Sequence, residues 1–261
     1  MVTVSDVVAF MQEVAPLEYA AKDDNVGLLL GDPAGEVARV MTALTLSPDV
    51  AEEAVEAGVD LVVVHHPFPY RPVMRVITAD PVGRLIWRLA GARIAVYSPH
   101  TAWDSARGGI NDQWAEALGL SNVRPLAELR PDGISAGRWG WLPQTCTLSE
   151  LVERVKAFVS AQQVGLVGEP DRMVQKVGVA CGSGAELLPA AIEAGCEVLI
   201  SGEMNYHRCL QCKSAGLGLI LVGHFASERF AMEHLAKMIA RRFPQLKVWA
   251  STVEKDPIVW C

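Results

Sequence analysis

Six side chains of the kinds that bind metal ions follow short apolar stretches in this 261-residue sequence. They are His65, His66, His100, Asp104, His224 and Glu228. Neutral imidazole is the commonest metal ligand in proteins, and carboxylates often bind the same ion. In two places a histidine precedes a carboxylate by four residues, which lets both face one ion if the residues form a helical turn. The pattern predicts a metal site.

The number of these side chains points to more than one ion. Even three histidines and two carboxylates are more ligands than one tetrahedral ion needs. They suit two ions about 3.5–4 Å apart, bridged by a carboxylate and with one position open to water. Such a site lowers the pKa of bound water far below that of bulk water, to about 7, and polarises a carbonyl, imine or phosphoryl oxygen. Imidazole and carboxylate suit Zn, Fe, Mn, Co or Ni, so we predict two divalent ions of unspecified identity.

The histidine pair has a defined place in the predicted fold. The aliphatic run 61–64 before it is typical of a strand buried on both faces, and Pro67 ends the strand because proline cannot donate a ladder hydrogen bond. Open α/β sheets place their ligand sites at the carboxyl ends of strands. A purely structural alternative remains open: adjacent strand residues point to opposite faces, so one histidine would be buried and the other exposed.

The elements that position these residues alternate between strand and helix, which predicts an α/β fold with mostly parallel sheets and flanking helices. Prolines and glycines over 121–144 predict a linker or a pair of edge strands, and a boundary near residue 125. The predicted strands cover 39–46, 61–66, 93–97, 176–180, 198–201, 217–222 and a short segment near 248; the predicted helices cover 7–14, 50–57, 82–90, 111–118, 148–159, 187–194, 207–215 and 229–243.

The sequence also contains an internal repeat. Residues 54–64 align with residues 191–201 at an offset of 137, each segment reading as helix, glycine and strand. Further along, His100 and Asp104 fall on His224 and Glu228. We therefore predict two similar α/β halves, 1–125 and 126–261, with no inserted domain, facing each other across a metal-binding cleft. Chance similarity between two α/β units is the alternative.

The composition excludes several classes of protein. The formal net charge of −7 and the lack of a long basic run argue against a nucleic-acid surface. The six cysteines are scattered, which indicates reduced thiols in a cytoplasmic protein, and the C-x-x-C pair Cys209 and Cys212 fits an ordinary helix better than a zinc knuckle. The N-terminal segment reads as a helix without the features of a signal peptide, and no apolar run is long enough for a membrane span.

Five segments together resemble the Nif-three-like family, also called the GTP cyclohydrolase type-two homologues. They are 24–29 (DNVGLL), 65–67 (HHP), 97–104 (YSPHTAWD), 201–204 (SGEM) and 224–228 (HFASE). The resemblance implies two α/β halves with a dinuclear metal centre in the cleft between them, assembled as a toroidal homohexamer. It places the metal ligands on His65, His66, Asp104, His224 and Glu228, and gives His100 a catalytic role in contact with the substrate or the ligands.

The function that the resemblance implies is a metal-dependent hydrolase acting on a C–N bond. Metal-bound hydroxide would attack an electrophilic carbon such as C8 of a purine, and a cyclohydrolase would release formate and a dihydroneopterin triphosphate. The substrate would be a small molecule, possibly a nucleotide; because the sequence has no P-loop, its phosphates would need Arg71, Arg75, a lysine or loop amides. A metal-containing scaffold or regulatory protein-interaction factor is the alternative, and metal storage or delivery is a third.

Overall fold

The computed structural model describes residues 1–127 and 136–259. Contacts between Cα atoms divide the chain into two compact units. The first unit comprises Met1–Trp103 and Ala231–Lys255, and the second comprises Asp104–Phe230 and the described residues from Asp256 onward.

The units differ from the two sequence halves because the chain returns to the first sheet near its C-terminus. The last strand, β13 (Lys247–Ala250), pairs in parallel with β4 (Arg39–Ala43). The division into halves at residue 125 stays a prediction, and residues 128–135 of the predicted linker lie outside the described residues.

A five-stranded sheet forms the centre of the first unit, with strand order β13-β4-β5-β6-β2 among the described residues. Strands β13, β4, β5 and β6 run parallel, whereas β2 is antiparallel to β6. Strands β1 and β3 form a separate antiparallel pair. The bounds are β1 Val2–Thr3, β2 Gly27–Leu30, β3 Glu36–Val37, β5 Leu61–Val64 and β6 Ala95–Ser98.

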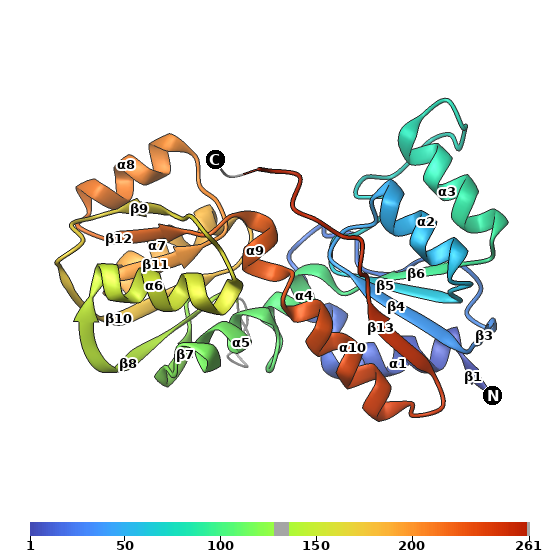
Figure 1. Ribbon diagram of the computed structural model, residues 1–261, viewed down its shortest axis with the longest axis horizontal. Helices are drawn as coiled ribbons and strands as arrows, with labels where there is room; N and C mark the ends of the chain where they lie inside the picture. The colour runs from blue at the N-terminus through green and yellow to red at the C-terminus, as the bar shows by residue number, and fades with distance from the viewer. Residues whose placement is uncertain (128–135, 260–261) are drawn as a thin grey trace. The chain divides into compact units, whose positions relative to one another are not determined.

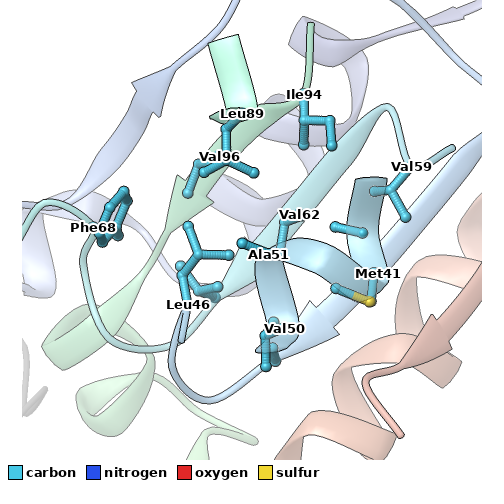
Figure 2. Packing of buried hydrophobic residues seen from close by; sticks show 13 residues of the cluster. Met41, Leu46, Val50, Ala51, Val59, Val62, Phe68, Leu89, Ile94 and Val96 are labelled. Atoms are coloured by element: carbon cyan, nitrogen blue, oxygen red, sulfur yellow. The ribbon is translucent and has the colours of Figure 1, made fainter. Parts of the chain in front are cut away.

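Helices cover both faces of this sheet (Figure 1). Side chains alternate along each strand, so Val62 and its neighbours on the same face pack against Val50 and Ala51 of α2 (Figure 2). On the opposite face the Thr42 hydroxyl donates a hydrogen bond of 2.8 Å to the Met232 carbonyl of α10. The helices of this unit are α1 Val4–Val14, η1 Leu17–Tyr19, α2 Pro48–Glu56, α3 Pro81–Gly91 and α10 Ala231–Arg242, and α4 His100–Ser105 begins here.

The second unit contains a six-stranded sheet with strand order β7-β8-β10-β11-β12-β9 among the described residues. Strands β10, β11 and β12 are parallel, and β9 is antiparallel to β12. Strand β8 lies between β7 and β10, so the segment around Trp139 predicted as a pair of edge strands supplies one interior strand. The bounds are β7 Ser121–Pro125, β8 Arg138–Thr147, β9 Gly165–Val167, β10 Met173–Ala180, β11 Val198–Ser201 and β12 Gly218–Leu221.

Two groups of helices pack on this second sheet. Helices α7 and α8 contribute Leu188, Ala191 and Cys212 to a buried apolar cluster that includes Leu199 and Leu219 of the sheet. An aromatic group of Trp114, Phe158 and Phe230 joins α5, α6 and the turn after α9, with ring centroids 4.6–5.8 Å apart. The helices are α5 Ile110–Ala117, α6 Leu148–Val159, η2 Gly184–Leu187, α7 Leu188–Glu193, α8 Tyr206–Ser214 and α9 His224–Glu228.

The two segments that align at the offset of 137 make equivalent hydrogen bonds, each within its own unit. The Asp60 carboxylate accepts hydrogen bonds of 2.8 Å from the backbone N–H groups of both residues 38 and 39. The Glu197 carboxylate accepts bonds of 2.6 and 2.9 Å from the N–H groups of residues 175 and 176. Arg39 and Lys176 also donate to equivalent carbonyls, those of Ala57 and Ala194. The helix-to-strand connections of the two units therefore have the same construction.

The predicted α/β class is confirmed, with mixed rather than purely parallel sheets. Within the described ranges, no helix combines the length and the apolar character that crossing a membrane requires. The predicted cleft between two facing halves stays a prediction.

Candidate metal centre

Three histidines of the first unit lie at the carboxyl ends of two adjacent parallel strands. His65 and His66 follow β5, and their N–H groups donate to the carbonyls of residues 43 and 44 at 3.0 and 2.8 Å, so the parallel pairing continues past the strand. His100 begins α4 directly after β6. One ring nitrogen from each histidine lies within 4.8 Å of the others, although His65 is buried and His66 only partly so. These three imidazoles could hold a metal ion.

The ring of His100 is held by an acidic partner. Its Nδ1 lies 2.8 Å from both carboxylate oxygens of Asp24, and Thr101 donates its hydroxyl to the same carboxylate. Burial raises the pKa of Asp24, but hydrogen bonds from His100 and Thr101 outweigh it and leave the pKa lowered. The φ of His100 is +35°, in the left-handed region that non-glycine residues seldom adopt. An ionised Asp24 therefore orients an imidazole on an unusual backbone.

The ring of His66 is held by a threonine, as the ring of His100 is held by Asp24. The Thr45 hydroxyl and His66 Nδ1 are 2.7 Å apart, so Nε2 is the nitrogen that would bind an ion. Thr45 follows β4, the strand next to β5. Sequence reasoning missed both Asp24 and Thr45 as supporting residues; the signal for Asp24 was its place in the DNVGLL segment.

The second unit brings one histidine between two carboxylates. His224 and Glu228 lie four residues apart on α9, with Nε2 and Oε2 separated by 3.2 Å, and Nδ1 lies 3.0 Å from Glu203 Oε1. The Glu228 side chain is buried, whereas Glu203 is exposed. The hydrogen bond with Glu228 is the main reason that the pKa of His224 rises to about 9; Glu203 adds to the rise and burial opposes it. This arrangement stabilises a positive charge.

A glycine leaves open the space beside these two side chains. A Cβ atom on Gly182 would lie 2.3 Å from Glu228 Oε1 and 3.3 Å from His224 Nε2. The φ of Gly182 is +59°, and its N–H donates a 2.9 Å hydrogen bond to the Ser227 hydroxyl on α9. A side chain here would press against the carboxylate and imidazole atoms that Glu228 and His224 could offer to a metal. The sequence carried no sign of this role, since a glycine offers no donor group.

The remaining predicted ligand, Asp104, contacts a cysteine. The Cys181 thiol donates to Asp104 Oδ1 at 3.3 Å, and Asn111 binds the Cys181 N–H and the Asp104 carbonyl. Burial is the main cause that raises the pKa of Cys181, and the charges of Asp104 and Glu228 add to it. Cys181 directly follows β10 and so shares the strand-end position of the predicted ligands, the one signal that would have found it.

The donor set fits a divalent metal. Imidazole, carboxylate and thiol are ligands for first-row transition metals, and the carboxylates supply the negative charge that a buried dication requires. His65, His66 and His100 gather in the first unit and His224 with Glu228 in the second, while Asp104 binds Cys181. The structure brings His100, predicted to be catalytic, as near to the histidine pair as a ligand would be.

Comparison with known proteins shows to which family this chain belongs. The profile of the family described as Duf34/NIF3 (NGG1p interacting factor 3) matches residues 2–257. A relative from Drosophila melanogaster, NIF3-like protein 1, is 34% identical over 97% of this chain and 87% of its own length. The chain belongs to the Duf34/NIF3 family. The match confirms the family that the five segments indicated.

Other Duf34/NIF3 relatives carry a second name. A Clostridium perfringens protein called GTP cyclohydrolase 1 type 2 homolog is 29% identical over 97% of both chains. The crystal structure of a Bacillus cereus protein related to NIF3 superposes with a TM-score of 0.92 at 21% identity, covering 100% of this chain and 99% of that one. At that identity the likeness establishes the fold.

Proposed function

We propose that this Duf34/NIF3 protein is a metal-dependent hydrolase that holds two divalent ions through His65, His66, Asp104, His224 and Glu228. The observation that carries the proposal is the gathering of donor groups at strand ends: His65 and His66 offer ring nitrogens at the end of β5, beside His100, and His224 Nε2 lies 3.2 Å from Glu228 Oε2. The relatives named GTP cyclohydrolase 1 type 2 homolog support hydrolysis of a C–N bond in a small molecule, such as a nucleotide.

The residues of the site would have different roles in the reaction. His65, His66, Asp104, His224 and Glu228 would hold the divalent ions, which would supply an acidified water and Lewis-acid polarisation of the substrate. Asp24 accepts the Nδ1 proton of His100, fixes the tautomer, and leaves Nε2 to exchange a proton with the substrate. Glu228 and Glu203 keep His224 oriented while supplying negative charge. His224 must lose its proton before it binds an ion.

We propose further that the histidines of the first unit and the acidic group of the second contribute to one centre. Neutral imidazoles alone leave the charge of two dications uncompensated, and Glu228 and Asp104 would reduce it. The matched hydrogen bonds at Asp60 and Glu197 show that each unit builds its helix-to-strand connection in the same way, as expected of a repeat. A homohexameric assembly belongs to the same proposal, by resemblance to the family.

A protein-binding scaffold is the second candidate. The side chains of Met74 and Trp87 are 99% and 65% exposed, and such apolar groups favour contact with a partner. The family description as an interacting factor points the same way.

Metal analysis of chelator-free protein, followed by a turnover screen with GTP and other nucleotides, separates the two candidates. His100→Gln should retain the metal and lose about 100-fold or more in turnover, because its proton-transfer group is gone. His207→Gln, a substitution at an exposed histidine of α8, is the matched control and should behave as wild type. Unchanged turnover in His100→Gln, or metal without turnover of any nucleotide, would favour the scaffold.

A further inference from the structure

The turn after β10 links the acidic segments of the second unit, although it holds none of the predicted metal ligands. At its start, the Cys181 thiol donates a 3.3 Å hydrogen bond to Asp104 Oδ1. The next residue, Gly182, donates its N–H to the Ser227 hydroxyl on α9 at 2.9 Å, and its carbonyl accepts a 3.0 Å bond from the Glu203 N–H. Two consecutive residues therefore hold three segments that carry carboxylates.

A buried amide closes a ring of hydrogen bonds around Asp104. Asn111, which is 2% exposed, donates from Nδ2 to the Asp104 carbonyl at 3.1 Å, and its Oδ1 accepts a 3.0 Å bond from the Cys181 N–H. With the thiol, these bonds join α4, α5 and the end of β10. Because a buried polar group left without a partner costs free energy, the ring restrains both the backbone and one carboxylate oxygen of Asp104.

Close packing connects the same turn to the helix that carries His224 and Glu228. The Ser227 hydroxyl, which accepts the Gly182 N–H, donates a 2.7 Å hydrogen bond to the His224 carbonyl. A Cβ atom on Gly202 would lie 2.6 Å from the Gly182 carbonyl oxygen and 2.7 Å from Ser227 Oγ, so β11 also packs tightly against this turn. A displacement of the turn would therefore move Asp104 and α9 relative to each other.

We infer that Cys181 and Asn111 are positioning residues of the metal centre, which hold the Asp104 carboxylate in place relative to the donor atoms on α9. Cys181 acts through the hydrogen bond from its thiol to Asp104, and Asn111 acts by fixing the backbone of both residues. Groups that hydrogen-bond to a metal ligand fix its orientation, and removing one typically costs about 10–100-fold in metal affinity. The inference rests on the proposed function for the role of Asp104 as a ligand.

Zinc affinity, measured on the full-length protein by competition with a chromophoric chelator, tests this inference. Cys181→Ala and Asn111→Ala should each weaken zinc binding by about 10-fold or more, and the double variant should lose less than the product, because both act on one ring. Cys181→Ser should stay within about threefold of wild type, since a hydroxyl also donates a hydrogen bond. Cys196→Ala removes another buried thiol, outside the ring, and should bind zinc as wild type does.

The visible spectrum of the cobalt(II)-loaded protein supplies a second readout. Its d–d bands should be preserved in Cys181→Ser and altered in Cys181→Ala, because only the serine variant still holds Asp104. A thiolate-to-cobalt charge-transfer band in the wild type that disappears in Cys181→Ser would overturn the inference, since Cys181 would then be a ligand itself.

The outcomes separate this inference from the proposed function. Wild-type zinc affinity in Cys181→Ala and Asn111→Ala, beside a clear loss in Asp104→Asn, would overturn the inference and leave the proposed ligands intact. Wild-type affinity in Asp104→Asn would refute the proposed ligand set, and the inference with it. The expected losses in a protein that hydrolyses no nucleotide would uphold the inference and refute the hydrolase.

Discussion

The two sheets share a strand plan and differ at their functional ends. In the first unit β4, β5 and β6 are parallel and β2 adds antiparallel to β6; in the second, β10, β11 and β12 are parallel and β9 adds antiparallel to β12. At the ends of β5 and β11, however, His65 and His66 stand where the second unit has Gly202 and Glu203. One sheet presents imidazoles, and the other presents mainly carboxylates.

The difference shows which parts of a repeat are constrained by folding and which by chemistry. Asp60 and Glu197 accept the same backbone hydrogen bonds because the connection from helix to strand needs them in either sheet. The strand ends carry no such requirement, so their side chains can diverge.

The largest expected effect is in the carboxylate-bearing unit, at Gly182. Gly182→Ala places a Cβ against Glu228 and His224 and strains a positive φ, so metal affinity should fall by about 100-fold or more. Gly216→Ala is the matched control: its φ is +67° and no atom lies within 4 Å of the added Cβ. Metal titration of both variants makes the comparison, and similar losses in the two would show that strain, not the occupied space, is responsible.

The next prediction concerns the equivalent carboxylates Asp60 and Glu197, and it asks whether they stabilise their two units to the same extent. Asp60→Ala and Glu197→Ala each remove a carboxylate that accepts two backbone hydrogen bonds, and each should lower the free energy of unfolding by about 2 kcal/mol. Urea denaturation of both variants measures this. A loss in one unit with none in the other would mean that the matched geometry does not reflect a matched role.

The smallest effect concerns a contact that only the first unit has. Glu53 accepts hydrogen bonds from Ser251 and Thr252 after β13, whereas the aligned position in the second unit is Ala190. Burial raises the pKa of Glu53, but these hydrogen bonds outweigh it and leave the pKa below 4.5. A lowered folded-state pKa contributes stability above the unfolded value of 4.5, and that contribution is lost as the pH falls through the folded value.

Glu53→Gln should therefore cost about 1 kcal/mol of unfolding free energy at neutral pH and nothing once wild-type Glu53 is protonated. Chemical denaturation of both proteins from about pH 7 down to about pH 3 follows the difference. A constant difference across that range would rule out ionisation of Glu53 as its source.

Much of the fold followed from local patterns in the sequence. The strand 198–201 and the helix 148–159 were predicted with the bounds observed, because an apolar run and a helical periodicity mark them locally. The pairing of β13 with β4 was not predicted, since it joins segments about 200 residues apart and leaves no local trace.

In the candidate site, too, the sequence indicated some residues and not others. Its six donor residues were nominated by type and by position after a strand, and their metal-binding role stays a prediction. The residues that position them escaped notice for physical reasons. Asp24 lies 76 residues from His100 in the chain, and Gly182 acts through the space it leaves open.

The central proposal is that both units contribute ligands to one metal centre, and a double-mutant cycle on metal affinity tests it most directly. His66→Ala removes a donor from the first unit and Glu228→Gln removes one from the second, in the full-length protein. If the centre is shared, each single variant lowers the affinity for both ions, and the double variant loses clearly less than the product of the two single losses. Independent, multiplicative losses, with each variant affecting one ion and leaving the other unchanged, would contradict a shared centre.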